Sequence, residues 1–344
     1  MKNYLKKPFT LGNITLPNNV FYSPLAGCSD FPFRKMAANY GPGLIYCEMV
    51  KMDAIVRHDP NTFHILDFDK GMHPIGAQLC GSKPNLAGPS ARILEELGFD
   101  VIDLNCGCPV DKVTKDGSGS GLLKNPQLIG ELISNIVAAV KIPVTVKIRA
   151  GWDEENIIAE EVTRIAEEAG AAAIAIHART RQQGYKGPAN WDYIKRCVDI
   201  RKNIKIIGNG DVFSPEAAQQ MFEQTGCDVV LVSRGTMGAP WIAEDILRYL
   251  DGLPPAERGP QQWREALLEH YRYILNYHPE RRVPIEMRRV GCWYVKSSAG
   301  TRQFRNLMSR VNSVDEIETL LHNFTFEEGV VDDAEIAVGE CDGC

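Results

Sequence analysis

Eight short apolar segments recur between residues 19 and 235, and this repetition constrains the fold more than any other feature of the chain. Most are rich in β-branched and aliphatic residues without strict alternation, which is typical of strands covered on both faces. We predict strands at residues 19–27, 43–50, 74–81, 100–107, 143–151, 172–180, 204–212 and 227–235. Eight strands separated by helices fit an α/β fold of the (β/α)8 TIM barrel type.

Amphipathic segments that predict helices lie between these strands. In residues 214–226, Ser214 is placed to cap a helix, Pro215 occupies its first position and Gly226 ends it. Gly170 is expected to end the helix before the sixth strand. A doubly wound open sheet is the main alternative. It requires a glycine-rich phosphate turn after the first strand, and SPLAGCSDF lacks the GxGxxG pattern.

The alternating pattern ends after Trp241, and the following sequence predicts helices without strands. We therefore expect a catalytic barrel at residues 1–245, a small helical domain at 246–325 and an acidic mobile tail at 326–344. The tail ends in CDGC. Because no second cysteine pair accompanies Cys341 and Cys344, a labile tail is favoured over a metal site or a redox pair.

Composition places the chain among ordinary globular enzymes. Hydrophobic residues make up 44% and charged residues 24% of the sequence. No apolar run approaches the ~18 residues that cross a bilayer, and the N-terminus lacks a signal-peptide pattern. Ten cysteines scattered through apolar segments are typical of free thiols in a reducing compartment. We expect a cytoplasmic protein with no membrane association and no obligate protein partner.

Charge is unevenly distributed along a chain whose net charge is −6. Residues 281–310 carry seven Arg and one Lys against one Glu, whereas residues 311–344 carry ten acidic groups and no Lys or Arg. A dense basic block indicates a face that binds a polyanion. The alternative is a helix with a charged outer face, and charge alone does not separate the two.

Polar residues follow the predicted strands at the edge where a TIM barrel gathers its loops and its active site. The residues at these strand ends are Pro24, Leu25, Ala26, Gln78, Asn105, Cys108, Lys147, His177, Asn209, Gly210, Asp211, Ser233 and Arg234. Arg234 beside Gly235 suits a phosphate, because a guanidinium and backbone N–H groups make charge-assisted bonds to its oxygens. The pattern predicts a bound ligand. A phosphosugar enzyme is the alternative at this stage.

Cys106 and Cys108 stand one residue apart in LNCGCPVDKVTKDGSGSG. A structural metal site needs four ligands, and no nearby His or Cys completes the set, so no metal is expected. A disulfide is disfavoured in a reducing cytosol. We expect Cys106 to pack in the base of the loop and Cys108, near two lysines, to be the reactive thiol. Flexibility that would let this loop open and close is expected at Gly117, Gly119 and Gly121.

Several fragments together resemble the tRNA-dihydrouridine synthase family, and most closely its bacterial B-type branch. The fragments are SPLAGCSDFPFR, GAQLCG, LNCGCPVDKV, VKIRAGW, IHARTR, GNGDV and SRGTMGAPW, followed by RRVGCWYVKSSAGTRQFR, which resembles the C-terminal helical signature of the family. They occur in the family order. Two positions depart from the family pattern: Ser233 stands where Gly is usual, and SPLAG replaces APMAG. Neither departure removes a charged group.

The resemblance implies an FMN-dependent reductase of uridines in tRNA that uses NADPH or NADH. Flavin N5 would give a hydride to uracil C6, and Cys108 would give the proton to C5, which a thiol of pKa ~8.5 can do at neutral pH. Asn105 would hold the carbonyl edge of the uracil. The residues implied in FMN binding are Pro24, Leu25, Ala26, Gln78, Lys147, His177, Asn209, Gly210, Asp211, Ser233 and Arg234.

Individual roles follow from side-chain chemistry. Lys147 would stabilise the negative charge of a reduced flavin, and the alternative is a Schiff-base lysine. Gln78 offers a donor and an acceptor to the pyrimidine edge of the flavin. Asp211 would accept from a ribityl hydroxyl. For His177, a structural core histidine is the alternative.

The same resemblance gives the basic block a purpose. A target base must leave the RNA stack at a cost of a few kcal/mol, which phosphate contacts can offset. The residues expected to contact tRNA are Arg179, Arg281, Arg282, Arg288, Arg289, Lys296, Arg302 and Arg305. Trp293 and Tyr294 would stack on bases or pack in the core of the helical domain, and packing is favoured.

Two other functions remain open from the sequence. An FMN oxidoreductase of a free pyrimidine, in the manner of dihydroorotate dehydrogenase, would share the barrel, the lysine and the flavin site. The basic block argues against it, because a small substrate needs no such surface. A non-catalytic RNA-binding protein that retains a flavin is the third possibility, and the behaviour of a Cys108→Ala variant separates it from an enzyme.

Overall fold

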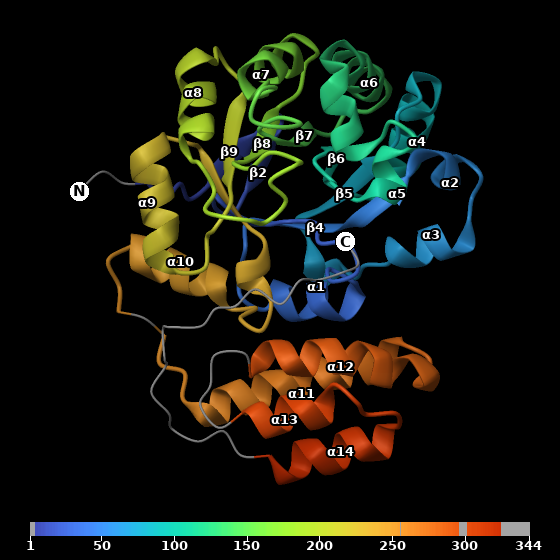
Figure 1. The fold of residues 1–344 in the computed structure, drawn as a ribbon, viewed down its shortest axis with the longest axis vertical. Coiled ribbons are helices and arrows are strands. Elements are labelled where there is room, and N and C mark those ends of the chain that lie inside the picture. Colours follow the sequence, from blue (N-terminus) through green and yellow to red (C-terminus); the bar gives the residue numbers. More distant parts are fainter. Residues whose placement is uncertain (1–3, 255, 296–300, 325–344) are drawn as a thin grey trace.

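The computed structural model describes residues 4–254, 256–295 and 301–324. Its centre is a closed barrel of eight parallel strands in the order β10-β3-β4-β5-β6-β7-β8-β9, which confirms the predicted TIM barrel (Figure 1). The strands are β3 (Val20–Tyr22), β4 (Leu44–Lys51), β5 (Ile75–Cys80), β6 (Val101–Cys106), β7 (Val144–Arg149), β8 (Ala173–His177), β9 (Lys205–Asn209) and β10 (Val229–Val232). Seven lie within the predicted segments, and β4 runs one residue past its segment, to Lys51. Their side chains are almost entirely buried, as expected for strands covered on both faces.

Helices surround the barrel between consecutive strands. They are α1 (Phe31–Ala38), α2 (Met52–Val56), α3 (Pro60–Ile65), α4 (Pro84–Glu96), α5 (Asp111–Thr114), α6 (Pro126–Ala139), α7 (Ala159–Glu168), α8 (Asp192–Ile200), α9 (Pro215–Thr225) and α10 (Ile242–Leu250), with short 3-10 turns η1 (Lys70–Met72), η2 (Gly119–Lys124) and η3 (Arg234–Thr236). The predicted caps of α9 are present: the Ser214 hydroxyl accepts from the Ala217 N–H, and Gly226 has a φ of 70°. Gly170 likewise follows α7 with a φ of 90°.

A β-hairpin that we did not predict precedes the barrel. Its strands β1 (Phe9–Leu11) and β2 (Ile14–Leu16) pair antiparallel. Leu11 and Leu16 are buried in one apolar cluster with Val101 and Val229, the first residues of β6 and β10. The hairpin therefore covers the amino end of the barrel and leaves the carboxyl end for the βα loops.

The C-terminal helices form a second unit with an apolar core of its own. They are α11 (Pro260–Tyr277), α12 (Val283–Tyr294), α13 (Arg302–Met308) and α14 (Val314–Asn323), with the turn η4 (Glu280–Arg282). Leu267, Met287 and Met308 are buried at its centre. Tyr294 is 1% exposed in the same core, so it packs there and is not available to stack on bases. Trp293 is partly buried against both this core and that of the barrel.

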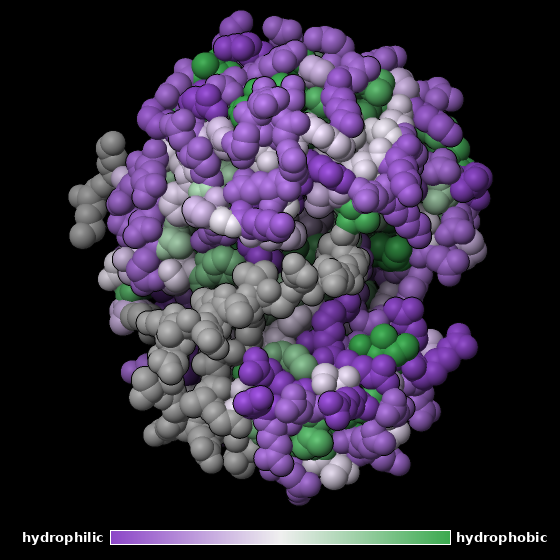
Figure 2. All heavy atoms as spheres, in the orientation of Figure 1, coloured by the Kyte–Doolittle hydropathy of each residue, from purple (hydrophilic) through white to green (hydrophobic). Residues whose placement is uncertain are grey.

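The expected boundary at residue 245 falls inside α10. Ile242, Ala243 and Ile246 of this helix are buried in the barrel core, so α10 belongs to the barrel and the chain leaves it after Leu250. The proposed tail at 326–344, with Cys341 and Cys344, lies outside the described residues. No helix within the described ranges has the length and apolar character that crossing a bilayer requires. The face shown in Figure 2 is mostly hydrophilic, with small separate hydrophobic patches.

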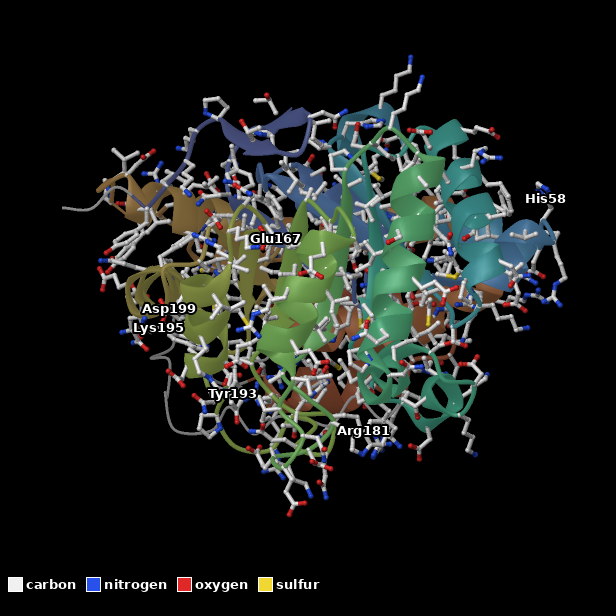
Figure 3. All side chains as sticks on the ribbon, turned by 90° about the horizontal axis from the view of Figure 1, so that it is seen from above. His58, Glu167, Arg181, Tyr193, Lys195 and Asp199 are labelled. Atoms are coloured by element: carbon white, nitrogen blue, oxygen red, sulfur yellow. The ribbon has the colours of Figure 1, made fainter. Side chains whose placement is uncertain are left out.

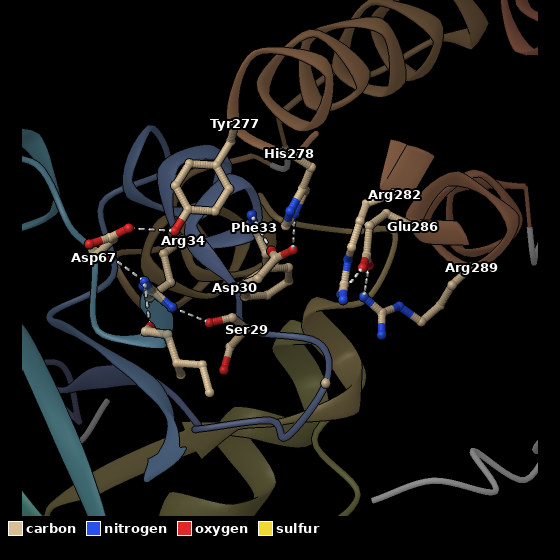
Figure 4. A network of polar contacts seen from close by, with 12 residues as sticks. Ser29, Asp30, Phe33, Arg34, Asp67, Tyr277, His278, Arg282, Glu286 and Arg289 are labelled. Carbon is tan, nitrogen blue, oxygen red and sulfur yellow. Dashed lines mark hydrogen bonds and ion pairs between the residues drawn. The ribbon is translucent and has the colours of Figure 1, made fainter. Parts of the chain in front are cut away.

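The helical unit is fixed to the barrel by polar contacts beside α1, partly buried or at the surface (Figure 4). His278 Nε2 lies 3.2 Å from Asp30 Oδ2, and the Tyr277 hydroxyl donates to Asp67 Oδ2 at 2.8 Å. Arg34 is fully buried in α1 and donates to the backbone carbonyls of Ser29 and Asp67. These bonds order the loops after β3 and β4, which face the helical unit.

His270 in α11 predicts how stability depends on pH. Burial lowers the pKa of His270 to about 4, because a charged imidazole would lose its hydration in this core. An unfolded chain binds this proton near pH 6.5, so stability should fall as pH drops from 6.5 towards 4. Between pH 7 and pH 5 the free energy of unfolding of the wild-type protein should fall. We expect this fall to be smaller in His270→Gln by on the order of 2 kcal/mol.

Urea unfolding of both proteins at the two pH values measures this difference. His322 is an exposed histidine of α14 and provides the control variant His322→Gln. If the free energy of unfolding changed equally with pH in His270→Gln and in the wild type, His270 would not be the group responsible for the loss of stability.

Candidate active site at the carboxyl end of the barrel

A cavity opens where β3, β7, β8, β9 and β10 end. Its lining consists of Ser23, Pro24, Leu25, Lys147, His177, Tyr185, Asn209, Gly210, Asp211, Val212, Phe213, Ser233, Arg234 and Gly235. Nine of the predicted cofactor residues are among them. Ala26 and Gln78 are not, although Ala26 neighbours Leu25 in the same loop. Residues from five strands thus meet at one site, as parallel strands in a closed barrel require.

Positive side chains dominate this cavity. Lys147 is partly exposed to it, and burial together with the nearby Arg149 lowers the pKa of Lys147 to about 8. Burial also lowers the pKa of Arg149 to about 10. The pKa of His177 lies well below its usual value, first because the ring is buried and then because the cations around it repel a further proton. Cations that destabilise one another in this way favour an anionic ligand, which would relieve the repulsion.

The ends of β9 and β10 are joined through amide and hydroxyl groups. Asn209 Nδ2 donates to the Leu231 carbonyl at 2.7 Å and to Ser233 Oγ at 2.9 Å. Ser233 is one of the two departures from the family pattern noted above, and its hydroxyl here bonds to Asn209. Gly210 has a φ of 126°, and a Cβ there would approach the Ala189 side chain to 2.8 Å. The site therefore requires glycine at this position.

Arg179 has a different place from the predicted one. Its side chain is 3% exposed, and its guanidinium donates to the Gly187 carbonyl and to Asp211 Oδ2, at 2.6 and 2.7 Å. It holds the loop after β8 from inside and does not present its charge to RNA. Asp211, which we expected to accept from a ligand hydroxyl, also accepts from the Ala189 N–H at 2.7 Å.

Arg181 lies further out on the same loop. Figure 3 shows it at the end of the barrel opposite Glu167, whose carboxylate accepts backbone N–H groups just before β9. The Arg181 guanidinium pairs with Asp111 and lies 4.8 Å from the centre of the Trp152 ring. Lys124 lies over the same ring at 3.6 Å. The carboxyl rim thus carries a partly exposed group of cations and one aromatic ring.

A second group of predicted residues lies at the ends of β5 and β6. Asn105 Nδ2 donates to Gln78 Oε1 at 2.8 Å, and Gln78 Nε2 donates to Asp103 Oδ2 at 2.7 Å. Asn105 Oδ1 accepts the N–H of Cys108 at 3.0 Å. In the barrel, Asn105 pairs in register with Lys147, so this amide group borders the cationic cavity.

Cys108 occupies the turn that follows β6. It is partly exposed, whereas Cys106 is fully buried, and burial raises the pKa of the Cys106 thiol well above its usual value. Arg149 Nε donates to the Gly107 carbonyl at 3.0 Å, and the Ser120 N–H donates to the Cys108 carbonyl at 3.0 Å. The charge of Cys108 affects the pKa of both Lys147 and Arg149, which places the three groups within electrostatic reach of one another.

The loop after Cys108 is folded back on itself. Gly117 and Gly119 have φ values of 80° and 58°, and a Cβ on Gly119 would approach the Cys108 carbonyl oxygen to 2.8 Å. Lys51 forms an ion pair of 2.7 Å with Asp116 at the tip of this loop. Its glycines thus determine the shape of a folded turn, and the predicted opening motion stays a prediction.

Sequence reasoning missed several residues of this site, among them Asp103, Arg149 and Tyr185. Asp103 and Arg149 are charged residues inside apolar strands, and that contrast could have marked them. Arg149 also donates to the carbonyls of Thr180 and Gly184, both at 2.8 Å, so it joins two rim loops. The Tyr185 ring lies 4.3 Å from the Arg234 guanidinium. No periodic pattern marks Tyr185, because it belongs to an irregular loop.

The predicted tRNA-contacting arginines divide into two groups. Arg288 donates to the Val311 carbonyl and Asn312 Oδ1, and Glu286 pairs with Arg282 and Arg289. These three arginines therefore support the helical unit itself. Arg282 is exposed although it pairs with Glu286. The exposed members for which no ion pair is found among the described residues are Arg281, Arg302 and Arg305. Lys296 lies outside the described residues.

The sequence matches the family model described as dihydrouridine synthase (Dus) over residues 21–328. The chain belongs to the dihydrouridine synthase family. It is 37% identical over 309 residues to tRNA-dihydrouridine synthase B of Pseudomonas aeruginosa, covering 89% of this chain and 92% of the relative. It is 36% identical over 319 residues to the probable tRNA-dihydrouridine synthase 1 of Synechocystis sp., covering 92% of this chain and 88% of the relative. The predicted family and its B-type branch are confirmed.

Solved structures share the fold at low sequence identity. Histamine dehydrogenase from Rhizobium sp. 4-9 aligns with a TM-score of 0.55 at 14% identity, over 78% of this chain. A 2-naphthoyl-CoA reductase aligns with a TM-score of 0.56 at 13% identity, over 74% of this chain. The chain spans about half the length of either protein, 50% and 53%. These similarities support the barrel architecture.

The site of this Dus family member suits a flavin phosphate by its donor chemistry. Arg234 is partly buried at the end of β10 and Gly235 follows it. Lys147 and Arg149, whose pKa values are lowered mainly by burial and also by neighbouring cations, add positive charge nearby. Neutral His177 can donate or accept one hydrogen bond. Among the described residues, no three His, Cys, Asp or Glu side chains gather as they would around a metal ion. The cationic residues of the cavity therefore fit an anion.

The titration of Lys147 gives a testable consequence for anion binding. Because its pKa is about 8, Lys147 is charged at pH 7 and largely neutral at pH 9. We expect the affinity of cofactor-free protein for sulfate, which does not titrate in this range, to fall about tenfold between these pH values. The Lys147→Met variant should bind sulfate weakly at both pH 7 and pH 9. Calorimetry measures the affinities, and the exposed Lys202→Met is the control. Equal pH dependence in Lys147→Met and wild type would rule out Lys147 as the titrating group.

Proposed function

We propose that the chain reduces specific uridines of tRNA to 5,6-dihydrouridine, with FMN as cofactor and NADPH or NADH as reductant. Membership in the dihydrouridine synthase family supports the reaction in general. The observation that supports the finer proposal is the meeting of two groups at the carboxyl rim. One is the cationic cavity with Lys147 and Arg234, and the other is the amide group with Asn105 that carries the Cys108 turn.

In this proposal the cavity holds the cofactor. Arg234 and the backbone of Gly235 bind the phosphate, and Asp211 and Gly210 lie beside the ribityl chain. Lys147 stabilises negative charge on the ring system, next to His177. When bound and reduced, FMN supplies the hydride for uracil C6. Ser23, Pro24 and Leu25, which follow β3, complete the lining of the cavity.

Cys108 acts as the general acid. Hydride addition at C6 leaves negative charge on the uracil, and C5 takes the proton from the Cys108 Sγ, which becomes a thiolate. Lys147 and Arg149 stabilise that thiolate by their charge, and water returns the proton afterwards. The Asn105 amide orients the uracil while it holds the Cys108 N–H at 3.0 Å.

The substrate RNA lies across the rim and the helical unit. Arg281, Arg302 and Arg305 are exposed on η4 and α13 and would bind backbone phosphates. Arg181 and Lys124 would do the same at the rim. These contacts offset the few kcal/mol needed to flip the target base out of its stack.

The decisive experiment combines a spectrum with an RNA assay. We expect the purified protein to bind FMN and to form dihydrouridine in tRNA from a strain that lacks the gene. Cys108→Ala should retain flavin and tRNA binding but lose turnover by at least about 100-fold, which is typical for removal of a general acid. Mass spectrometry of the tRNA measures the product, and Cys292→Ala, a partly exposed thiol on α12, is the matched control.

Protein that takes up no FMN would disprove the cofactor assignment. Full activity of Cys108→Ala would disprove the role of the thiol. Reduction of free uracil at a rate independent of RNA would instead favour the free-pyrimidine oxidoreductase. Flavin and tRNA binding with no product formed by the wild type would favour a non-catalytic RNA-binding protein.

The exposed arginines yield a separate prediction about RNA binding. Replacing Arg302 and Arg305 together by Gln should weaken tRNA binding uniformly and reduce the slope of log Kd against log salt by roughly 2, one for each lost phosphate contact. Arg92→Gln with Arg164→Gln removes two exposed arginines from the outer barrel helices and serves as control. Filter binding at several salt concentrations measures both slopes. An unchanged slope in the Arg302/Arg305 variant would remove α13 from the RNA-binding surface.

A further inference from the structure

A continuous line of buried polar groups runs from the barrel core to the Cys108 turn. Thr145 Oγ1 donates to Asp103 Oδ1 at 2.6 Å, and Gln78 Nε2 donates to Asp103 Oδ2 at 2.7 Å. Asn105 Nδ2 then donates to Gln78 Oε1 at 2.8 Å. All four side chains are at most 7% exposed. Buried hydrogen bonds of this kind are strong and costly to break.

The line ends on two backbone N–H groups. Asn105 Oδ1 accepts from Gly107 at 3.2 Å and from Cys108 at 3.0 Å. At the other end, the Tyr46 hydroxyl lies 3.3 Å from Thr145 Oγ1, so a donor is available there as well. Every group between the two ends therefore has a hydrogen-bonding partner.

Only one orientation of the two amides satisfies both ends. An ionised carboxylate can only accept, so Gln78 must turn its NH2 group towards Asp103 and its carbonyl towards Asn105. The backbone N–H groups can only donate, so Asn105 must turn its carbonyl towards the Cys108 turn and its NH2 group towards Gln78. The two requirements agree. A flipped amide would bring two acceptors or two donors together at buried sites.

We propose that Asp103 is a positioning residue, whose carboxylate fixes the orientation of Gln78 and Asn105 and, through Asn105, the turn that carries Cys108. This inference deepens the proposed function and rests on it for the role of Cys108. The orientation itself requires no cofactor, because all of its bonds lie within the protein. Gln78 and Asn105 then present fixed donors and acceptors to whatever occupies the rim.

Protonation of Asp103 would disturb this arrangement. Burial raises the pKa of Asp103 to about 6, although hydrogen bonds from Gln78 and Thr145 and the charge of Lys147 oppose the rise. With the proton on Oδ2, the carboxyl would turn a donor towards the Gln78 NH2 group, which can only donate. With the proton on Oδ1, accepted by the Thr145 hydroxyl, the hydrogen bond from Gln78 would lose its charge assistance. The other titratable groups that face it are Tyr46 on β4 and Cys106 on its own strand, and the pKa of both is raised, so they stay neutral near pH 6.

The test measures the turn directly, by hydrogen exchange of the peptide that contains residues 105–110. Asp103→Leu is close in size to the native residue but cannot accept, so the N–H groups of 107 and 108 should exchange about tenfold faster, as expected for losing one buried hydrogen bond. Asp103→Asn retains an oxygen for Gln78 and should exchange at nearly the native rate. Asp228→Leu, a buried carboxylate at the amino end of the barrel, controls for general destabilisation.

Activity of the holoenzyme on tRNA against pH gives a readout that a merely structural role would not move. Wild-type kcat should fall as pH drops through about 6, where Asp103 gains its proton. Thr145→Val removes a hydrogen bond that stabilises the ionised form of Asp103. The acid limb of its pH profile, which is the fall of kcat at low pH, should therefore move to higher pH. Asp103→Asn has no carboxyl and should lose that limb. Asp103→Leu should lower kcat about tenfold or more at pH 7.5 with flavin content unchanged.

The outcomes separate this inference from the proposed function. Unchanged exchange at 107 and 108 in Asp103→Leu would overturn the positioning role, and so would an acid limb that persists in Asp103→Asn. Faster exchange in Asp103→Leu together with no dihydrouridine from wild-type protein would leave the positioning of the turn intact and reject the proposed reaction instead.

Discussion

The common direction of eight strands in a closed barrel is the constraint on which the site depends. Because the strands are parallel, their last residues all reach the same rim, and side chains separated by many residues in sequence become neighbours. Lys147, His177 and Arg234 meet at this rim, and none of them is close to another in the chain. The positive charge that gathers there has a cost, visible in the lowered pKa values of Lys147 and His177. Such a cost is typical of a binding site and not of a structural core.

The rim divides into two chemically different halves that share a border. The half formed by β7 to β10 and β3 is cationic and suits an anion. The half formed by β5 and β6 consists of amides held by a buried carboxylate, and it suits a neutral, hydrogen-bonding ring. Asn105 and Lys147 are partners in register across β6 and β7, so the border lies between them. Arg149, two residues after Lys147, joins the loops of both halves through backbone carbonyls.

Most of the fold and many of the site residues could be predicted from the sequence, for physical reasons that also explain the failures. Strands buried on both faces are apolar throughout, so all eight were visible, and polar residues at their ends marked the cavity. Local pattern does not reveal which partner a charged side chain finds. Arg179 and Arg288 were therefore expected at an RNA surface, although their guanidinium groups bond to the protein's own carbonyls. The Asp103 line was missed because it depends on the register between strands.

The hairpin of β1 and β2 has a consequence for the order of events in the proposed reaction. Since its leucines cover the amino end of the barrel, molecules can approach the cavity only from the rim where the loops lie. A nicotinamide ring and a flipped uracil would then both need the same entrance to the cavity. In the proposed reaction the donor of electrons would have to leave before the RNA takes its place, and the architecture of the barrel would then separate the two half-reactions in time.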